Sequence, residues 1–289
     1  MICDPANPKA SGMVDVWQET FPVRFGAIDR SDRLTMDAVF QYFQEAAICH
    51  AENLGVGRED MARTGQVWIL SRISVLIDRR PKYNETVTVR TWPRGGEKLF
   101  AMRDFDIRDK DDRAAVSGRS AWIILDIEKR RPLRPQSIMD RLPQNEGLYA
   151  LPPEAGGAAA LAERDNLQKA SERKAFYTDI DYNGHVNNVR YVQWIEDTIG
   201  SRLFEKAEKM RLDINYMNEI LGDEVTKIMY TPIEDENHAP SADEYSGEYA
   251  GEYAGEYAGE YAGEYAFAFE GRKKESEQAA FRAELRLWL

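Results

Sequence analysis

The sequence contains an internal duplication, and this duplication limits the folds that the chain can adopt. The segment Ile28–Arg33 aligns with Ile180–His185, and the same register continues further along, where Gln41 corresponds to Gln193. A repeated sequence indicates a repeated unit of secondary structure. We therefore expect two units of similar fold, joined in one chain of 289 residues.

Each half shows the pattern of a strand, then a long helix, then several strands. Apolar residues of Thr35–Asn53 recur at the i, i+3, i+4 spacing of a helix. In the first half, strands are expected at Val14–Phe25, Val67–Asp78, Glu85–Trp92, Phe100–Arg108 and Ala114–Ile127. In the second half, a helix is expected near Asn188–Phe204 and strands at Glu172–Thr178, Arg211–Tyr216, Glu224–Tyr230, Tyr265–Glu270 and Ala279–Trp288. This pattern predicts an α+β fold in which a curved antiparallel sheet wraps around a central helix.

Two changes of composition divide the chain. A Pro- and Gly-rich stretch at 151–157 predicts a linker over 138–170, between an N-terminal domain at 13–137 and a C-terminal domain at 171–289. Within the second domain, Gly-Glu-Tyr-Ala repeats five times from Gly247 to Ala266. A period of four gives neither a strand nor a helix a continuous apolar face. We therefore predict a mobile, low-complexity insertion at about 234–264.

Composition excludes several classes of function. The net charge of −12 argues against general nucleic-acid binding, which requires a basic surface. The apolar runs are only as long as strands, so no membrane span is expected. The first residues resemble neither a signal peptide nor a transit peptide, which predicts a cytoplasmic protein. Cys3 and Cys49 are too few for a disulfide framework and are expected to be reduced.

Three histidines could take part in chemistry. His50 lies in the first predicted helix, which favours a buried structural role, and His238 lies in the predicted insertion, where no role is expected. His185 lies in Asp181-Tyr182-Asn183-Gly184-His185-Val186-Asn187-Asn188, just before the second predicted helix. These residue types also suit a turn followed by a helix cap. The residues alone leave both interpretations of His185 open.

The motif carries a resemblance to a known family. Residues 181–191, followed by Trp194-Ile195-Glu196, closely resemble the active-site segment of plant and bacterial acyl-acyl carrier protein thioesterases. The resemblance continues in the first half through residues 44–47, 68–72 and 75–81. It implies a tandem (double) hotdog fold, in which each half is a curved antiparallel sheet wrapped around a long helix. The duplication agrees with this independently.

The resemblance also implies a set of site residues. In this family the Asp, Asn and His of the motif act together with a Glu on the following strand. These positions fall here on Asp181, Asn183, His185 and Glu219. Plant members often have Cys after that Glu, but this chain has Ile220, so no thiol nucleophile is available there. The first copy has Ser31 and Arg33 at the matching positions and is expected to shape a tunnel for the acyl chain.

Thioester hydrolysis needs few groups. A carboxylate of Asp181 or Glu219 can act as base toward water or as direct nucleophile, and the sequence does not choose between them. His185 can transfer or orient a proton, since its ordinary pKa lies near neutral pH. The N–H groups at the start of the second helix can stabilise the oxyanion. No metal ion and no organic cofactor is expected.

The function expected from these features is hydrolysis of fatty acyl-acyl carrier protein to free fatty acid and carrier. Acyl-coenzyme A hydrolysis, a non-catalytic acyl-binding or regulatory role and a dehydratase activity are the alternatives. The carrier protein, itself acidic, is expected to dock on a local basic patch. Three basic clusters are candidates for that patch: Lys129-Arg130-Arg131 with Arg134, Arg79-Arg80 with Lys82, and Arg272-Lys273-Lys274. Monomer and homodimer are both compatible with the sequence.

Overall fold

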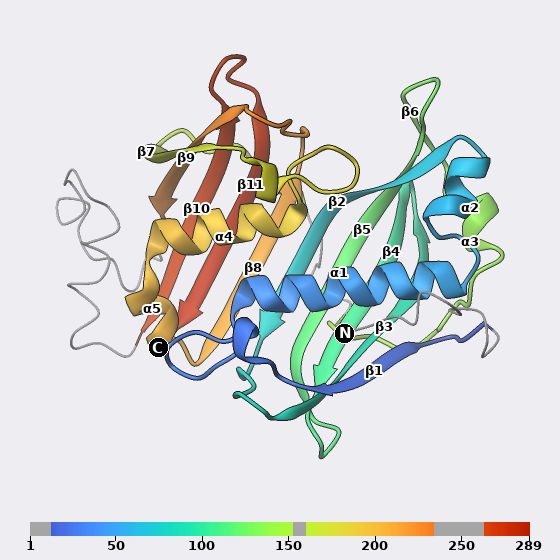
Figure 1. The fold of residues 1–289 in the computed structure, drawn as a ribbon, viewed down its shortest axis with the longest axis horizontal. Helices are drawn as coiled ribbons and strands as arrows, with labels where there is room; N and C mark the ends of the chain where they lie inside the picture. Colours follow the sequence, from blue (N-terminus) through green and yellow to red (C-terminus); the bar gives the residue numbers. More distant parts are fainter. Residues whose placement is uncertain (1–12, 153–159, 234–262) are drawn as a thin grey trace. The chain divides into compact units, whose positions relative to one another are not determined.

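The chain folds into two units that share one plan. The computed structural model describes residues 13–152, 160–233 and 263–289. Unit 1 extends to Ala159 and unit 2 starts at Ala160, inside the predicted linker. Each unit combines one long helix with an antiparallel sheet (Figure 1). Among the described residues, no helix has both the length and the apolar character needed to cross a membrane.

Unit 1 places its helix across the face of its sheet (Figure 1). Its strands are β1 (Trp17–Pro22), β2 (Gln66–Ile77), β3 (Thr86–Glu97), β4 (Phe100–Arg108) and β5 (Ala114–Asp126), and a short β6 (Arg131–Leu133) pairs with β5. The spatial order is β1-β3-β4-β5-β2, and the neighbours are antiparallel. Helix α1 (Met36–Asn53) begins after Thr35, whose hydroxyl accepts a hydrogen bond from the Ala38 N–H. This cap satisfies one of the free N–H groups at the helix start.

Unit 2 repeats the connectivity of unit 1. Its strands are β7 (Gln168–Lys174), β8 (Lys209–Tyr216), β9 (Val225–Pro232), β10 (Glu264–Lys273) and β11 (Ala279–Trp288). They lie in the order β7-β9-β10-β11-β8, which matches unit 1 strand for strand. Helix α4 (Asn188–Ile199) corresponds to α1. The duplication predicted from the sequence is therefore confirmed as a repeat of the fold.

The core of each unit lies between the helix and the sheet. Phe43 of α1 stacks on Phe105 of β4 with ring centroids 4.6 Å apart. In unit 2, Tyr191 of α4 packs edge-on against Phe281 of β11 at 5.2 Å. These aromatic side chains each remove a large apolar area from water, which is the main source of stability at a helix–sheet contact.

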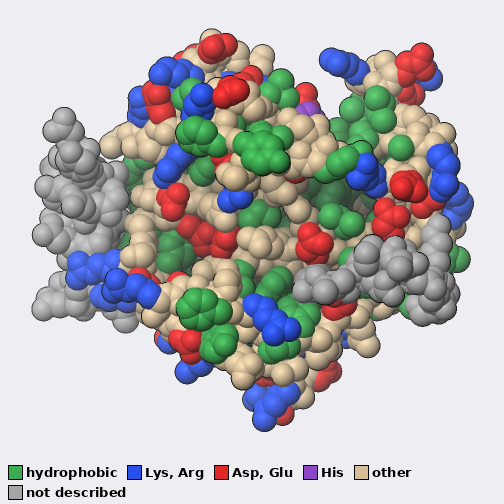
Figure 2. Space-filling model, viewed as in Figure 1, with side chains coloured by type: hydrophobic (Ala, Val, Ile, Leu, Met, Phe, Trp, Pro, Cys, Tyr) green, Lys and Arg blue, Asp and Glu red, His purple; other side chains and the backbone are tan. Residues whose placement is uncertain are grey.

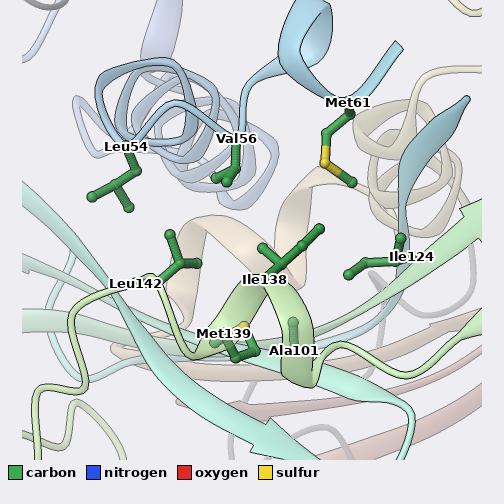
Figure 3. Packing of buried hydrophobic residues seen from close by; sticks show 8 residues of the cluster. All are labelled: Leu54, Val56, Met61, Ala101, Ile124, Ile138, Met139 and Leu142. Atoms are coloured by element: carbon green, nitrogen blue, oxygen red, sulfur yellow. The ribbon is translucent and has the colours of Figure 1, made fainter. Parts of the chain in front are cut away.

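A second apolar cluster closes one end of unit 1 (Figure 3). It joins the residues after α1 to two short helices, α2 (Arg58–Arg63) and α3 (Gln136–Met139). Its buried members are Leu54, Val56, Met61, Ala101, Ile124, Ile138, Met139 and Leu142. The packing of unit 1 therefore continues past residue 137, where we expected the linker to begin.

The structure differs from the sequence-based expectations at a few points. The helix predicted over Asn188–Phe204 is broken at Gly200, whose φ of +84° ends α4 before α5 (Ser201–Lys206) begins. The helices α2 and α3 and the strand β6 were not predicted, because each is too short to show a period. The insertion predicted at 234–264 lies almost entirely outside the described residues.

The expectation of a reduced cysteine is wrong for Cys49. This residue is buried in α1 and is disulfide-bonded. A cysteine count too low for a disulfide framework does not exclude a single disulfide bond, so the count alone did not predict the state of Cys49.

Charged side chains of both signs are interspersed over the face shown in Figure 2. Ion pairs also form along the strands, such as Arg90 with Asp106 at 2.6 Å and Arg211 with Asp213 at 2.7 Å. The acidic net charge is therefore not a uniform field over this surface.

Candidate active site

A tight loop between β7 and α4 carries the motif residues. The Asp181 N–H donates to the carbonyl of His185 at 2.8 Å, and the Gly184 N–H donates to the carbonyl of Asp181 at 3.0 Å. Gly184 has a φ of +83°, a backbone conformation in which a residue with a Cβ is strained. Glycine adopts this conformation without strain, and its counterpart in the loop of unit 1, Asp32, also has a positive φ, of +63°.

The start of α4 follows this loop directly. The side chain of Asn187 accepts a hydrogen bond from the Val189 N–H at 2.9 Å and caps the helix, as expected for one of the two asparagines. The hydroxyl of Tyr216, from β8, donates to the carbonyl of Asn188 at 3.1 Å. The helix start, with its positive dipole end, is thus held next to the motif loop.

Glu219 reaches the loop from the connection between β8 and β9. The Val186 N–H donates to the carbonyl of Ile220 at 2.8 Å, and this bond draws the two segments together. His185 Nε2 lies 3.0 Å from Glu219 Oε2, with the two side chains 37% and 63% exposed. The structure therefore brings these two predicted site residues into direct contact where water can reach them. Glu219 lies after the end of β8, not on a strand as the family resemblance implied.

Asp181 and Asn183 have different surroundings. Asp181 Oδ1 accepts hydrogen bonds from the Asn183 N–H at 2.7 Å and, more weakly, from the His185 N–H at 3.4 Å. The side chain of Asn183 is exposed, and within the described residues its amide makes no hydrogen bond to His185 or Glu219. Of the four predicted residues, only His185 and Glu219 meet through their side chains.

Tyr191 lies behind this pair on the first turns of α4, and the sequence analysis did not select it as a site residue. Its side chain is buried, and burial raises the pKa of its hydroxyl, with further contributions from the negative charges of Asp181, Glu224 and Glu219. The phenol therefore remains protonated. Its position within the motif was the signal that could have identified it.

Unit 1 contains the counterpart of this site with different groups. Leu34 N–H donates to the carbonyl of Pro81 at 2.8 Å, just as Val186 does to Ile220, so Arg80 occupies the position of Glu219. Arg80 is buried and forms an ion pair with Asp29, the counterpart of Asp181. Burial alone would raise the pKa of Asp29, but hydrogen bonds from Ser31 and Arg80 outweigh it and lower that pKa.

The comparison with known families now identifies the chain. Residues 14–141 match the acyl-ACP thioesterase N-terminal domain, and residues 162–261 match the acyl-ACP thioesterase C-terminal domain. The chain belongs to the acyl-ACP thioesterase family. The two acyl-ACP thioesterase domains fall on units 1 and 2, and the second contains His185 and Glu219.

Relatives of this chain include plant proteins. A chloroplastic dodecanoyl-[acyl-carrier-protein] hydrolase of Cinnamomum camphora is 26% identical over 242 residues, covering 75% of this chain and 59% of that protein. A chloroplastic oleoyl-acyl carrier protein thioesterase of Arabidopsis thaliana is 25% identical over 234 residues, covering 74% and 62%. The chain therefore spans less than two thirds of the length of these relatives.

Solved structures show that the acyl-ACP thioesterase fold extends over nearly the whole chain. An acyl-ACP thioesterase from Bacteroides thetaiotaomicron has a TM-score of 0.74 at 24% identity, covering 94% of this chain and 98% of that chain. The 12:0-ACP thioesterase from Umbellularia californica has a TM-score of 0.72 at 21% identity, covering 95% and 97%. The prediction of a tandem hotdog is confirmed.

Proposed function

We propose that this protein hydrolyses the thioester of fatty acyl-acyl carrier protein, releasing free fatty acid and carrier. The observation that supports this most directly is the contact of His185 with Glu219 beside the start of α4. The names of the relatives, which act on acyl carrier protein, agree with it. A protein that only bound acyl chains would not need such a pair at an exposed position.

The pair divides the chemistry between its two members. With Nε2–H donating to Glu219, the lone pair of the neutral imidazole lies on Nδ1, and it can take a proton from water. The carboxylate of Glu219 fixes this tautomer and stabilises the imidazolium that forms. The alternative, in which Glu219 itself takes the proton or attacks the carbonyl, uses the same two groups.

The water oxygen then forms a bond to the thioester carbon, and a negative charge develops on the carbonyl oxygen. The N–H groups and the dipole at the start of α4 offer a stabilising environment for this oxyanion. When the carbon–sulfur bond breaks, the imidazolium returns its proton to the thiolate of the carrier. The products are a fatty acid and a free thiol, so atoms and charge balance.

Release of free thiol from acyl-carrier protein, measured beside acyl-coenzyme A, tests the proposal. We expect His185→Ala and Glu219→Ala to lower kcat by about 10² to 10⁴. The counterparts Ser31→Ala and Arg33→Ala, with folded fractions matched, should change kcat by less than about tenfold. Turnover of acyl-coenzyme A alone would favour the coenzyme A alternative. A wild-type protein inactive on both substrates would contradict the hydrolase assignment.

The carrier protein is proposed to dock on the β5–β6 hairpin. In the two other basic clusters, most cations already have carboxylate partners: Arg79 with Glu85, Arg80 with Asp29, Arg272 with Glu270, Lys273 with Glu224 and Lys274 with Glu172. On the hairpin, Arg130 and Arg134 are exposed and form no ion pair with a described residue. These two positive charges are available to an acidic partner.

Charge reversal tests this docking surface. Arg130→Glu with Arg134→Glu should raise KM for acyl-carrier protein in a salt-sensitive way and leave hydrolysis of a small thioester unchanged. Lys274→Glu is the matched control, because the partner of Lys274 already neutralises it. Equal effects of both changes on KM, or equal effects on both substrates, would exclude the hairpin as the docking site.

Four other expectations remain predictions. They are the acyl-chain tunnel in the first unit, the absence of a cofactor, a cytoplasmic location, and the choice between monomer and homodimer.

A further inference from the structure

We infer that exposed apolar side chains beside His185 and Glu219 bind the pantetheine part of the carrier's arm. In an acyl carrier protein the acyl group is bonded to the sulfur at the end of a phosphopantetheine arm, and pantetheine is the uncharged part of that arm next to the sulfur. The inference rests on the proposed function, because it takes the thioester to react where His185 meets Glu219. It assigns a binding role to residues outside that contact.

The exposed apolar side chains of unit 2 gather on two short segments. Among the described residues of this unit, the large apolar side chains with high exposure all lie within 176–182 or 217–221. They are Phe176, Tyr177, Tyr182, Met217 and Leu221, and we call them the apolar rim. Their exposed fractions run from 45% for Leu221 to 93% for Tyr177. Exposed apolar side chains that cluster in this way indicate a binding surface, whereas scattered ones need no explanation.

Backbone contacts bring both segments to the reacting groups. Leu221 forms a β-bridge with His185, and it lies two residues after Glu219. The Asp223 N–H donates to the carbonyl of Ala175 at 3.0 Å, and this bond ties the start of the first segment to the second. The apolar rim therefore borders the contact between His185 and Glu219. An arm that is bonded to the reacting thioester passes the residues that border it.

The charges on these segments argue against the protein surface of the carrier as the occupant. Residues 176–182 and 217–224 contain no Lys or Arg, and they contain five carboxylates: Asp179, Asp181, Glu219, Asp223 and Glu224. Three of these carboxylates are paired with cations of other segments: Asp223 with Lys174, Glu224 with Lys273 and Asp179 with Arg190. An acidic protein surface or a phosphate group would therefore find no available cation on these segments.

The exposure of the apolar rim argues against the acyl chain as the occupant. A long alkyl chain is stabilised by leaving water, and side chains as exposed as Tyr177 do not enclose it. Pantetheine fits such a surface, because its methyl groups can pack on aromatic rings while its amide groups stay hydrated. The rim is therefore matched to the uncharged, amphipathic part of the arm.

Substrates with and without the arm test the inference. The quantity to measure is the ratio of kcat/KM for an acyl-pantetheine to kcat/KM for the same acyl group on ethanethiol. We expect Tyr177→Ala and Leu221→Ala each to lower this ratio by about tenfold, which corresponds to roughly half the burial of such a side chain. Tyr177→Phe should keep the ratio, because the ring is retained. Phe25→Ala is the matched control, since Phe25 is also highly exposed and is the counterpart of Tyr177 in unit 1.

A second measurement does not depend on turnover. In saturation-transfer NMR with pantetheine alone, the wild type should transfer magnetisation to the methyl groups of the ligand. The signal should be lost in the double variant Tyr177→Ala with Leu221→Ala and should be kept in Phe25→Ala. All the changed side chains are exposed, so melting temperatures should match that of the wild type.

The outcomes separate this inference from the proposed function. A ratio that both alanine variants leave unchanged would overturn the inference, and so would pantetheine binding that persists in the double variant. A wild-type dimer that Tyr177→Ala dissociates in analytical ultracentrifugation would overturn it too, because a second copy would then occupy the rim. Rim-dependent pantetheine binding by a wild type without hydrolase activity would count against the proposed function alone.

Discussion

His50 gives unit 1 a stability that depends on pH. The side chain is fully buried in the last turn of α1. Its Nδ1 lies 3.1 Å from Arg103 Nη1, and its Nε2 lies 2.9 Å from the carbonyl oxygen of Val14. Because a guanidinium can only donate, Nδ1 accepts and Nε2–H donates to Val14. The imidazole is therefore neutral in the folded protein, which agrees with the structural role expected for it.

Burial, reinforced by the positive charge of Arg103, lowers the pKa of His50 from 6.5 to about 3. Between these values the unfolded chain takes up a proton that the folded chain does not bind. The contribution to stability is complete above about pH 6.5 and decreases as the pH falls toward about 3. The slope approaches about 1.4 kcal/mol per pH unit, so the free energy of unfolding should fall by about 2 kcal/mol between pH 8 and pH 5.

His50→Gln removes this titration and keeps an amide that can donate to Val14 and accept from Arg103. Urea unfolding at pH 8 and pH 5 can be followed by tryptophan fluorescence, to which Trp17 contributes with its ring 6.3 Å from the imidazole. The variant should be less stable at pH 8, but its loss on going to pH 5 should be about 2 kcal/mol smaller than in wild type. Subtracting the loss in the variant from the loss in wild type cancels the contributions of the other titrating groups, which both proteins share. Equal losses in the two proteins would refute this account of His50.

Three further predictions concern stability. Arg80→Ala leaves Asp29 without its partner in a largely buried pair and should lower the free energy of unfolding by about 3–5 kcal/mol, measured by chemical denaturation. Asn187→Ala removes the cap of α4 and should cost about 1 kcal/mol, and Thr35→Ala at the equivalent cap is its control in unit 1. Replacing residues 234–262 by a short Gly/Asn turn should leave melting temperature and activity nearly unchanged, since Pro232 already pairs with Phe267 across β9 and β10. A large loss of either would show that the repeat has a structural role.

Most of the fold could be predicted because its elements are long and periodic. The helix expected at Thr35–Asn53 and the strand expected at Phe100–Arg108 match α1 and β4. The helix break at Gly200 was missed, because a single glycine does not interrupt an apolar period enough to be noticed. The cluster around α2 and α3 depends on contacts between distant segments, which local patterns do not contain.

The candidate site was only partly predictable for the same reason. The loop residues are contiguous in sequence, and the family motif marks them. The contact between His185 and Glu219 depends on how the β8–β9 connection meets the loop, through the bond from Val186 to Ile220. The role of Arg80 was not visible either, since the sequence alignment of the copies stops short of it.

The two copies show how one loop can serve stability or chemistry. In unit 1 the position after the second strand holds Arg80, which is buried, bonded to the carbonyl of Leu34 at 2.9 Å and paired with Asp29. In unit 2 the same position holds Glu219, whose side chain is mostly exposed and contacts the motif loop at His185. An exposed pair contributes little to folding. Residues at the position of Glu219 can therefore vary at little cost to stability, which is compatible with the proton transfer proposed for them, while loss of one partner of the buried pair in unit 1 would destabilise that unit.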